Sequence, residues 1–159
     1  MKTLTIGDLK ARIPIIQGGM GVGISLSGLA SAVANEGGIG VISAAGLGIL
    51  YKKLSPSNYT EAGNLGLAEE IRKAREKAKG IIGVKVMVAL SDFAELVKTS
   101  IAEKVDIIFS GAGLPLDLPS FLKKDSVTKL VPSFPAHVPY ASSARNGRIT
   151  MIIFRMRWY

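Results

Sequence analysis

The chain has 159 residues, of which 48% are hydrophobic, and a mean hydropathy of +0.33, a balance that excludes a disordered segment and suits one domain with a buried core. The N-terminal sequence MKTLTIGDLKARIP lacks the apolar stretch of a secretory signal, no apolar run is long enough to span a membrane, and cysteine is absent, so we predict a cytoplasmic protein with no membrane contact and no thiol chemistry. Half of the net charge of +8 comes from the four arginines of residues 133–159, and because no basic-aromatic motif accompanies it, we predict no nucleic-acid partner.

Five apolar segments predict strands that are buried on both faces. Each is a run of aliphatic, mostly β-branched residues with little polar alternation. The expected strands span residues 13–17, 39–43, 81–90 and 105–111, and a fifth begins at 128–132.

Helical patterns separate these strands. The first predicted helix begins at Ser25 or Ser27 and ends at Gly37-Gly38, and its residues Leu29, Ala32 and Val33 share one face. The others span residues 61–80, 92–104 and 118–124, and residues 44–60 are expected to form a loop. In the helix at 92–104, Asp92 and Glu95 stand at capping-box spacing, and the buried face consists of Phe93, Leu96, Val97 and Ile101.

The alternation of strand and helix predicts an α/β fold with parallel strands. Two architectures satisfy it, an open doubly wound sheet and a (βα)8 barrel, and both place function at the carboxyl ends of the strands. Glycines gather at these ends, at 18–23, at 46 and 48, and at 111 and 113.

The glycine-rich stretch GGMGVG fits neither of two common phosphate-binding motifs. It reads G-x-G-x-G rather than G-x-G-x-x-G, no acid ends the second strand, and no Gly-Lys-Ser/Thr follows. Two interpretations remain: a tight strand-to-helix turn, or backbone N–H groups that face a flat or anionic ligand. The second gains weight because FSGAGLP repeats the pattern at the end of the fourth strand.

No catalytic side chains or metal ligands emerge from the residues alone. His137 is a lone histidine in an irregular segment, Asp106 begins a strand at the end opposite to function, and Asp117 has no identifiable partner. We therefore predict no metal site, and any enzymatic chemistry would need a cofactor.

Four segments in order, PIIQGGMGVGIS, AVANEGGIGVIS, GVKVMVAL and DIIFSGAGLPLDLP, resemble the nitronate monooxygenase (2-nitropropane dioxygenase) family and its relatives, the flavin-dependent enoyl-acyl-carrier-protein reductases. The resemblance implies the N-terminal portion of a TIM (β/α)8 barrel, truncated after about four and a half βα units, with FMN at the carboxyl ends of the strands. Carried onto this chain, the FMN contacts are Gly19, Met20, Gly21, Ser43, Ala44, Lys85, Met87, Gly111 and Gly113. Many relatives have Asn where Lys85 stands.

The resemblance implies an FMN-dependent oxidoreductase that acts on a small molecule. Three readings stay open: oxidative denitrification of alkyl nitronates with O2, reduction of an enoyl thioester with NAD(P)H, and a non-catalytic half-barrel that serves as an assembly unit. The family's catalytic histidine and phosphate-binding loops lie beyond the matching region, so we expect little or no activity from these residues alone.

The likeness covers residues 1–132, and we interpret residues 133–159 as a divergent tail, frameshifted or irregular. A half-barrel leaves two open sheet edges, which favour self-association. Residues 149–154, ITMIIF, are expected to add a strand to an edge or to promote aggregation.

Overall fold

The computed structural model describes residues 2–113, 117–122, 126–135 and 152–154. It is an α/β structure whose main sheet contains β3 (Ile39–Ser43), β4 (Ile81–Met87), β5 (Ile107–Gly111), β6 (Lys129–Pro135) and β7 (Ile152–Phe154). The helices are α1 (Ser27–Asn35), α2 (Leu47–Leu50), α3 (Tyr59–Lys77) and α4 (Phe93–Ala102), with short 3-10 turns η1 (Lys52–Leu54) and η2 (Leu118–Phe121). No helix among these described residues is long and apolar enough to cross a membrane.

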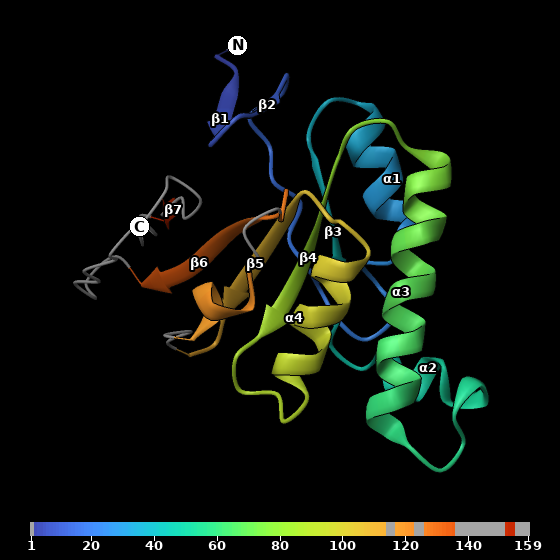
Figure 1. Cartoon of the computed structure of the whole chain (residues 1–159). Helices are drawn as coiled ribbons and strands as arrows, with labels where there is room; N and C mark the ends of the chain where they lie inside the picture. Colours follow the sequence, from blue (N-terminus) through green and yellow to red (C-terminus); the bar gives the residue numbers. More distant parts are fainter. Residues whose placement is uncertain (1, 114–116, 123–125, 136–151, 155–159) are drawn as a thin grey trace, which may run out of the picture.

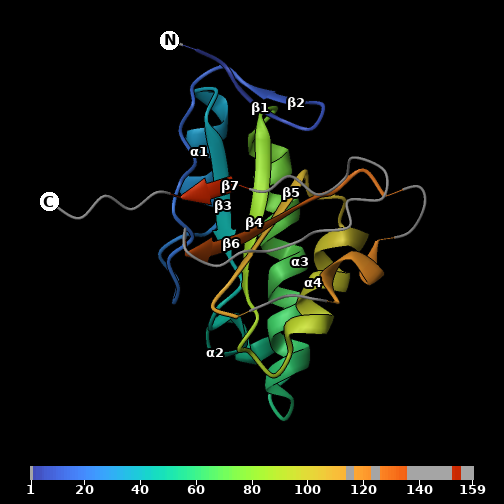
Figure 2. The same ribbon diagram turned by 90° about the vertical axis from the view of Figure 1, so that its left-hand side faces the viewer.

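The strand order distinguishes between the two architectures that the sequence left open. All neighbouring strands are parallel, and they lie side by side in chain order, β3-β4-β5-β6-β7, with no reversal. Helices α1, α3 and α4 all cover the same face of the sheet (Figures 1 and 2). A doubly wound sheet reverses its order and carries helices on both faces, so the arrangement is that of part of a barrel.

Two separate hydrophobic clusters fill the two faces of the sheet. Alternate strand residues such as Ile42, Val84 and Ile108 pack against the helices. The intervening residues, including Val41 and Phe109, form a second cluster on the face that lines the interior of a barrel. Burial on both faces explains why the strands read as continuous apolar runs.

The prediction of a strand at residues 13–17 is wrong, although the segment lies beside β3. Only one bridge, Ile16 to Ile39, joins them, with the Gln17 N–H donating to Ile39 O at 3.0 Å. The N–H of Ile15 donates instead to Ile13 O at 2.8 Å, and Pro14 has no N–H, so a regular ladder cannot form.

A hairpin that the sequence analysis missed closes the inner face at the amino ends of the strands. It pairs β1 (Leu4–Ile6) with β2 (Leu9–Ala11) in antiparallel fashion, and Gly7 turns it with a φ of +60°. Ile6 and Ala11 belong to the inner cluster, and Figure 1 shows the hairpin opposite the end that carries α2. The strands have three residues each, too few to show a period.

Helix α1 faces the core with small residues, not with the predicted larger ones. Ala30 and Ala34 are buried, whereas Leu29 is 44% exposed. The helix lies so close to β3 that a Cβ on Gly40 would come within 1.9 Å of Ala30 O. Only a face of small side chains permits this approach.

The remaining helices agree with the prediction in place but differ in detail. Asn58, rather than Asp92, makes a side-chain cap: its Oδ1 accepts from Glu61 N at 3.1 Å at the start of α3. Asp92 precedes α4 without such a bond. The expected loop 44–60 contains α2 and η1, and the strand expected to reach residue 90 ends at Met87.

Buried Glu70 joins α3 to the start of α1 and to the loop after β3. Its carboxylate accepts a hydrogen bond from Ser27 N at 2.6 Å and another from the Tyr51 hydroxyl. Burial raises the pKa of Glu70, but the bonds from Tyr51 and Ser27 outweigh it, and the net pKa is lowered. Burial and the same carboxylate raise the pKa of Tyr51 to about 12.

We expect Glu70→Gln to lower the free energy of unfolding by about 1–2 kcal/mol at neutral pH, because a neutral amide accepts these hydrogen bonds more weakly than a charged carboxylate does. A lowered folded-state pKa stabilises the protein above the ordinary value of 4.5 and loses that effect as the pH falls through the folded-state pKa. The difference in the free energy of unfolding between wild type and variant, measured by urea unfolding, should therefore narrow well below pH 4.5. A gap that stays constant with pH would contradict this role.

The prediction that residues 149–154 add an edge strand is confirmed in part. β7 pairs in parallel with β6, with Ser133 opposite Ile152. Residues 136–151, which include His137, and residues 155–159 lie outside the described residues, so the divergent tail stays a prediction.

Candidate functional site

The glycine-rich loop, residues 18–23, lies at the carboxyl ends of the strands, between residues 13–17 and α1. Ser25, a residue that is 1% exposed, fixes the shape of the loop, because its Oγ makes two hydrogen bonds to the loop backbone. The Oγ donates to Gly18 O at 3.1 Å and accepts from Met20 N at 3.0 Å. The loop is therefore held by partly buried hydrogen bonds to one side chain.

Gln17 links this loop to the sheet. Its Nε2 donates to Ser25 Oγ at 3.1 Å and to Val41 O at 3.0 Å, and its Oε1 accepts from Val41 N at 3.1 Å. The amide replaces the ladder bonds that a regular strand at residues 13–17 would have made. The backbone carbonyl of Ser25 makes a further link to β3, because it accepts a hydrogen bond from Ser43 N at 2.8 Å.

The fixed loop leaves backbone donors unused. Among the described residues, no hydrogen bond engages the N–H of Gly19 or of Gly21. Gly21 also lies against the next loop, where an added Cβ would be 2.9 Å from Ala45 O. Free N–H groups on a rigid loop can bind the acceptor atoms of a flat or anionic ligand.

Lys85 lies between the two glycine-rich strand ends. It stands in β4 opposite Ser43 of β3 and Phe109 of β5, and shares the inner face with Phe109. A Cβ on Gly19 would lie 2.5 Å from the Cβ of Lys85, and a Cβ on Gly111 would lie 2.7 Å from its Nζ. The two glycines thus make room for this side chain, which points to the inner face of the sheet.

The electrostatic setting of Lys85 is unusual for a lysine. Burial lowers its pKa, and no carboxylate of the described residues forms an ion pair with it. A half-buried ammonium group without a counter-ion attracts an anion.

The end of β5 adds the second half of the site. Met87 pairs with Gly111, and Met87 is 37% exposed at the end of its strand. Gly113 has a φ of +146°, and its backbone approaches Val88 so closely that an added Cβ would lie 2.9 Å from the Val88 Cβ. Glycine is required there by both conformation and space.

Ser43 and Ala44 lie at the end of β3 and are held by the sheet. Ser43 ends β3 and is 4% exposed. The side chain of Ala44 belongs to the helix-facing cluster, and its N–H already donates to Lys85 O at 3.0 Å. Ala44 therefore supports the strand ends without a free N–H for a ligand.

The structure brings all nine predicted contact residues to the carboxyl end of one sheet, and it adds Gln17 and Ser25, whose role the sequence analysis missed. The sequence signal for this role is that Gln17 and Ser25 flank the glycine loop in QGGMGVGIS. Ser25 also fits a helix cap, which is how the sequence analysis interprets it. Asp106, by contrast, has a structural role, because it accepts from Ile82 N at 2.8 Å and pairs with Arg75 at 2.8 Å.

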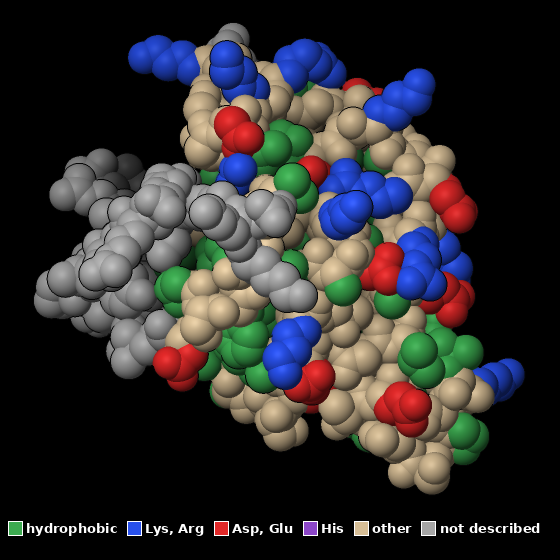
Figure 3. Space-filling view, viewed as in Figure 1, with side chains coloured by type: hydrophobic (Ala, Val, Ile, Leu, Met, Phe, Trp, Pro, Cys, Tyr) green, Lys and Arg blue, Asp and Glu red, His purple; other side chains and the backbone are tan. Residues whose placement is uncertain are grey.

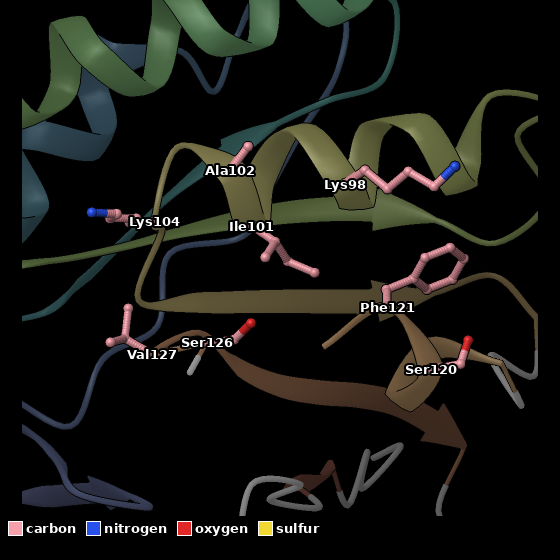
Figure 4. Close-up of a pocket in the computed structure, with 8 residues that line it drawn as sticks. All are labelled: Lys98, Ile101, Ala102, Lys104, Ser120, Phe121, Ser126 and Val127. Carbon is pink, nitrogen blue, oxygen red and sulfur yellow. The ribbon is translucent and has the colours of Figure 1, made fainter. Parts of the chain in front are cut away.

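The structure also contains a cavity of about 830 Å³ away from this site. It lies beside α4 and η2, and its lining includes Ile101 and Phe121 (Figure 4). None of the nine predicted residues lines it. Within the described residues, no group of three potential metal ligands exists, and acidic and basic side chains are interspersed over the helical face in Figure 3.

Comparison with known proteins supports the fold. The chain is similar to the solved structure of FabK from Thermotoga maritima, at 27% sequence identity and a TM-score of 0.57, over 77% of this chain and 34% of that one. It is similar to the M276A mutant of the same protein at 30% identity and a TM-score of 0.60, over 77% and 35% of the two chains. The chain thus spans about a third of the length of these structures, and no curated protein sequence matches it.

The family profile gives the wider match. That of the nitronate monooxygenase family covers residues 2–146, which includes every predicted site residue and extends beyond residue 132, where the sequence analysis ended the likeness. On a match of this extent, together with the barrel-type sheet and the glycine-rich strand ends, the chain belongs to the nitronate monooxygenase family.

Proposed function

We propose that the chain forms the FMN-binding part of a flavin-dependent oxidoreductase that oxidises nitronates. The observation that carries the proposal is the fixed glycine loop: Ser25 and Gln17 hold it, the N–H groups of Gly19 and Gly21 are left free, and Gly19 lies against the stem of Lys85. Such a loop provides donors for the polar edge of a flavin ring, and its glycines let the ring approach the backbone.

The residues present fit the cofactor in shape and charge. The loop supplies neutral donors, Lys85 supplies a positive charge, and exposed Met20 and Met87 supply apolar surface at the same end of the sheet. When bound, FMN would supply the electron transfer that no described side chain offers. The part of this chain is to bind and orient the ring.

A second candidate is reduction of an enoyl thioester with NAD(P)H. It is favoured by the similarity to FabK, a flavin-dependent enoyl-acyl-carrier-protein reductase of the same family. The two candidates share the FMN site and differ in the substrate that reaches it. We favour the nitronate because the family profile that covers residues 2–146 is that of the nitronate monooxygenases.

Titration of FMN with the purified chain tests the proposal. We expect the flavin fluorescence to fall on binding, and the absorbance spectrum of the bound flavin to change further when propane-2-nitronate is added. A change with NAD(P)H or an enoyl thioester instead would select the second candidate. Unchanged fluorescence at saturating chain would contradict both and favour a non-catalytic half-barrel.

A further inference from the structure

The side chain of Lys85 is held in one direction by two glycines from different strand ends. Its stem lies against Gly19, and its Nζ lies over Gly111, where an added Cβ would also come within 3.5 Å of the Ser133 Cβ of β6. The ammonium group therefore lies on the inner face beside Gly111, and the stem of the side chain lies against the glycine loop. No carboxylate among the described residues neutralises it.

An isolated charge in this position has an electrostatic cost that a ligand can remove. Burial already lowers the pKa of Lys85, which is the expected effect of taking an ammonium group from water without a partner. A negative charge placed beside Nζ would offset this unfavourable free energy by electrostatic attraction. A neutral ligand would not.

We propose that Lys85 makes this site prefer the reduced, anionic form of the flavin over the oxidised, neutral ring. The inference rests on the proposed function, because it needs FMN at the glycine loop. An oxidised flavin ring that gains two electrons and one proton becomes an anion, and the attraction between that charge and the Lys85 ammonium stabilises the reduced form alone. Lys85 is thus a tuning residue that sets how readily the bound flavin accepts electrons.

The test compares the affinities of the two flavin forms, with dithionite as the reductant under anaerobic conditions. For each chain, the dissociation constants of oxidised and reduced FMN are measured and their ratio is taken. We expect wild type to bind the reduced form preferentially and Lys85→Gln to lose roughly tenfold of that preference, which corresponds to about 30 mV in a two-electron potential. Lys85→Arg, which keeps the charge, should retain it.

Matched variants separate charge from folding. Lys10→Gln removes the same charge from the exposed hairpin at the opposite end of the strands and should leave the ratio unchanged. Circular dichroism checks each fold, and Lys85→Met replaces Lys85→Gln in the comparison if the latter unfolds. Riboflavin, which lacks the phosphate, should show the same dependence on Lys85 as FMN.

The outcomes differ for the two proposals. If FMN binds and the ratio is the same in wild type, Lys85→Gln and Lys85→Met, the inference is wrong and the proposed function stands. If the effect of Lys85 disappears with riboflavin, the lysine contacts the phosphate and not the ring, which also overturns it. If neither flavin form binds any chain, the proposed function fails and the inference fails with it.

Discussion

Replacement of Gly40 by Ala is expected to destabilise the fold by about 3 kcal/mol, the largest effect that we predict for a single methyl group. An added Cβ would lie 1.9 Å from Ala30 O and 2.6 Å from the Ala30 carbonyl carbon, both of which are backbone atoms of α1. Backbone cannot rotate away as a flexible side chain can, so α1 must move off β3. Urea unfolding of the variant should show a midpoint far below that of wild type.

Gly28→Ala is the matched control for this prediction. Gly28 lies in α1 itself, and an added Cβ there would meet nothing within 4 Å. Alanine favours the helix over glycine, so this variant should gain roughly 0.5 kcal/mol. Equal stability of the two variants would mean that α1 does not pack on β3 as closely as described.

Ser25→Ala is expected to weaken FMN binding roughly tenfold, or about 1.4 kcal/mol, and to lower the free energy of unfolding by about 2 kcal/mol. The change removes the acceptor of Met20 N and the donor to Gly18 O, and it leaves Gln17 Nε2 with fewer partners. The loop then samples conformations in which the N–H groups of Gly19 and Gly21 are no longer held in place. FMN binding must then order the loop, and the entropy lost in ordering it lowers the affinity for FMN.

Fluorescence titration with FMN, run beside urea unfolding, separates the two effects. Ser57→Ala, at an exposed position before α3, makes the same chemical change without a buried bond and should match wild type in both measurements. Loss of stability with unchanged FMN affinity would show that the shape of the loop is unimportant to binding, and would remove the main support for the proposed site.

The strands that are buried on both faces were the most predictable part of the molecule. Ile39–Ser43 was predicted to the residue and Ile107–Gly111 began two residues later than expected, because a continuous aliphatic run leaves few alternatives. The segment at residues 13–17 has the same composition but makes only one bridge. Its pairing depends on the side chain of Gln17, which no local pattern reveals.

Contacts between distant residues account for the rest of the differences. The buried face of α1 is set by the approach to Gly40, ten residues after Ala30, so helical spacing alone favoured the larger side chains on the wrong face. The predicted site residues did meet at one sheet end, since parallel strands share that end. For the glycine-rich loop, the sequence left open a tight turn or a surface for a ligand, and the structure adds that Gly19 and Gly111 make room for the side chain of Lys85.

The most direct test of the account is a map of where FMN binds, made by following the backbone amide signals of the 15N-labelled chain during titration with FMN. The account predicts that the largest shifts fall on Gly19, Gly21 and Gly111, with the amide of Lys85 among them. Shifts confined to the cavity beside α4, at Ile101 and Phe121, or no shift at any amide, would contradict it.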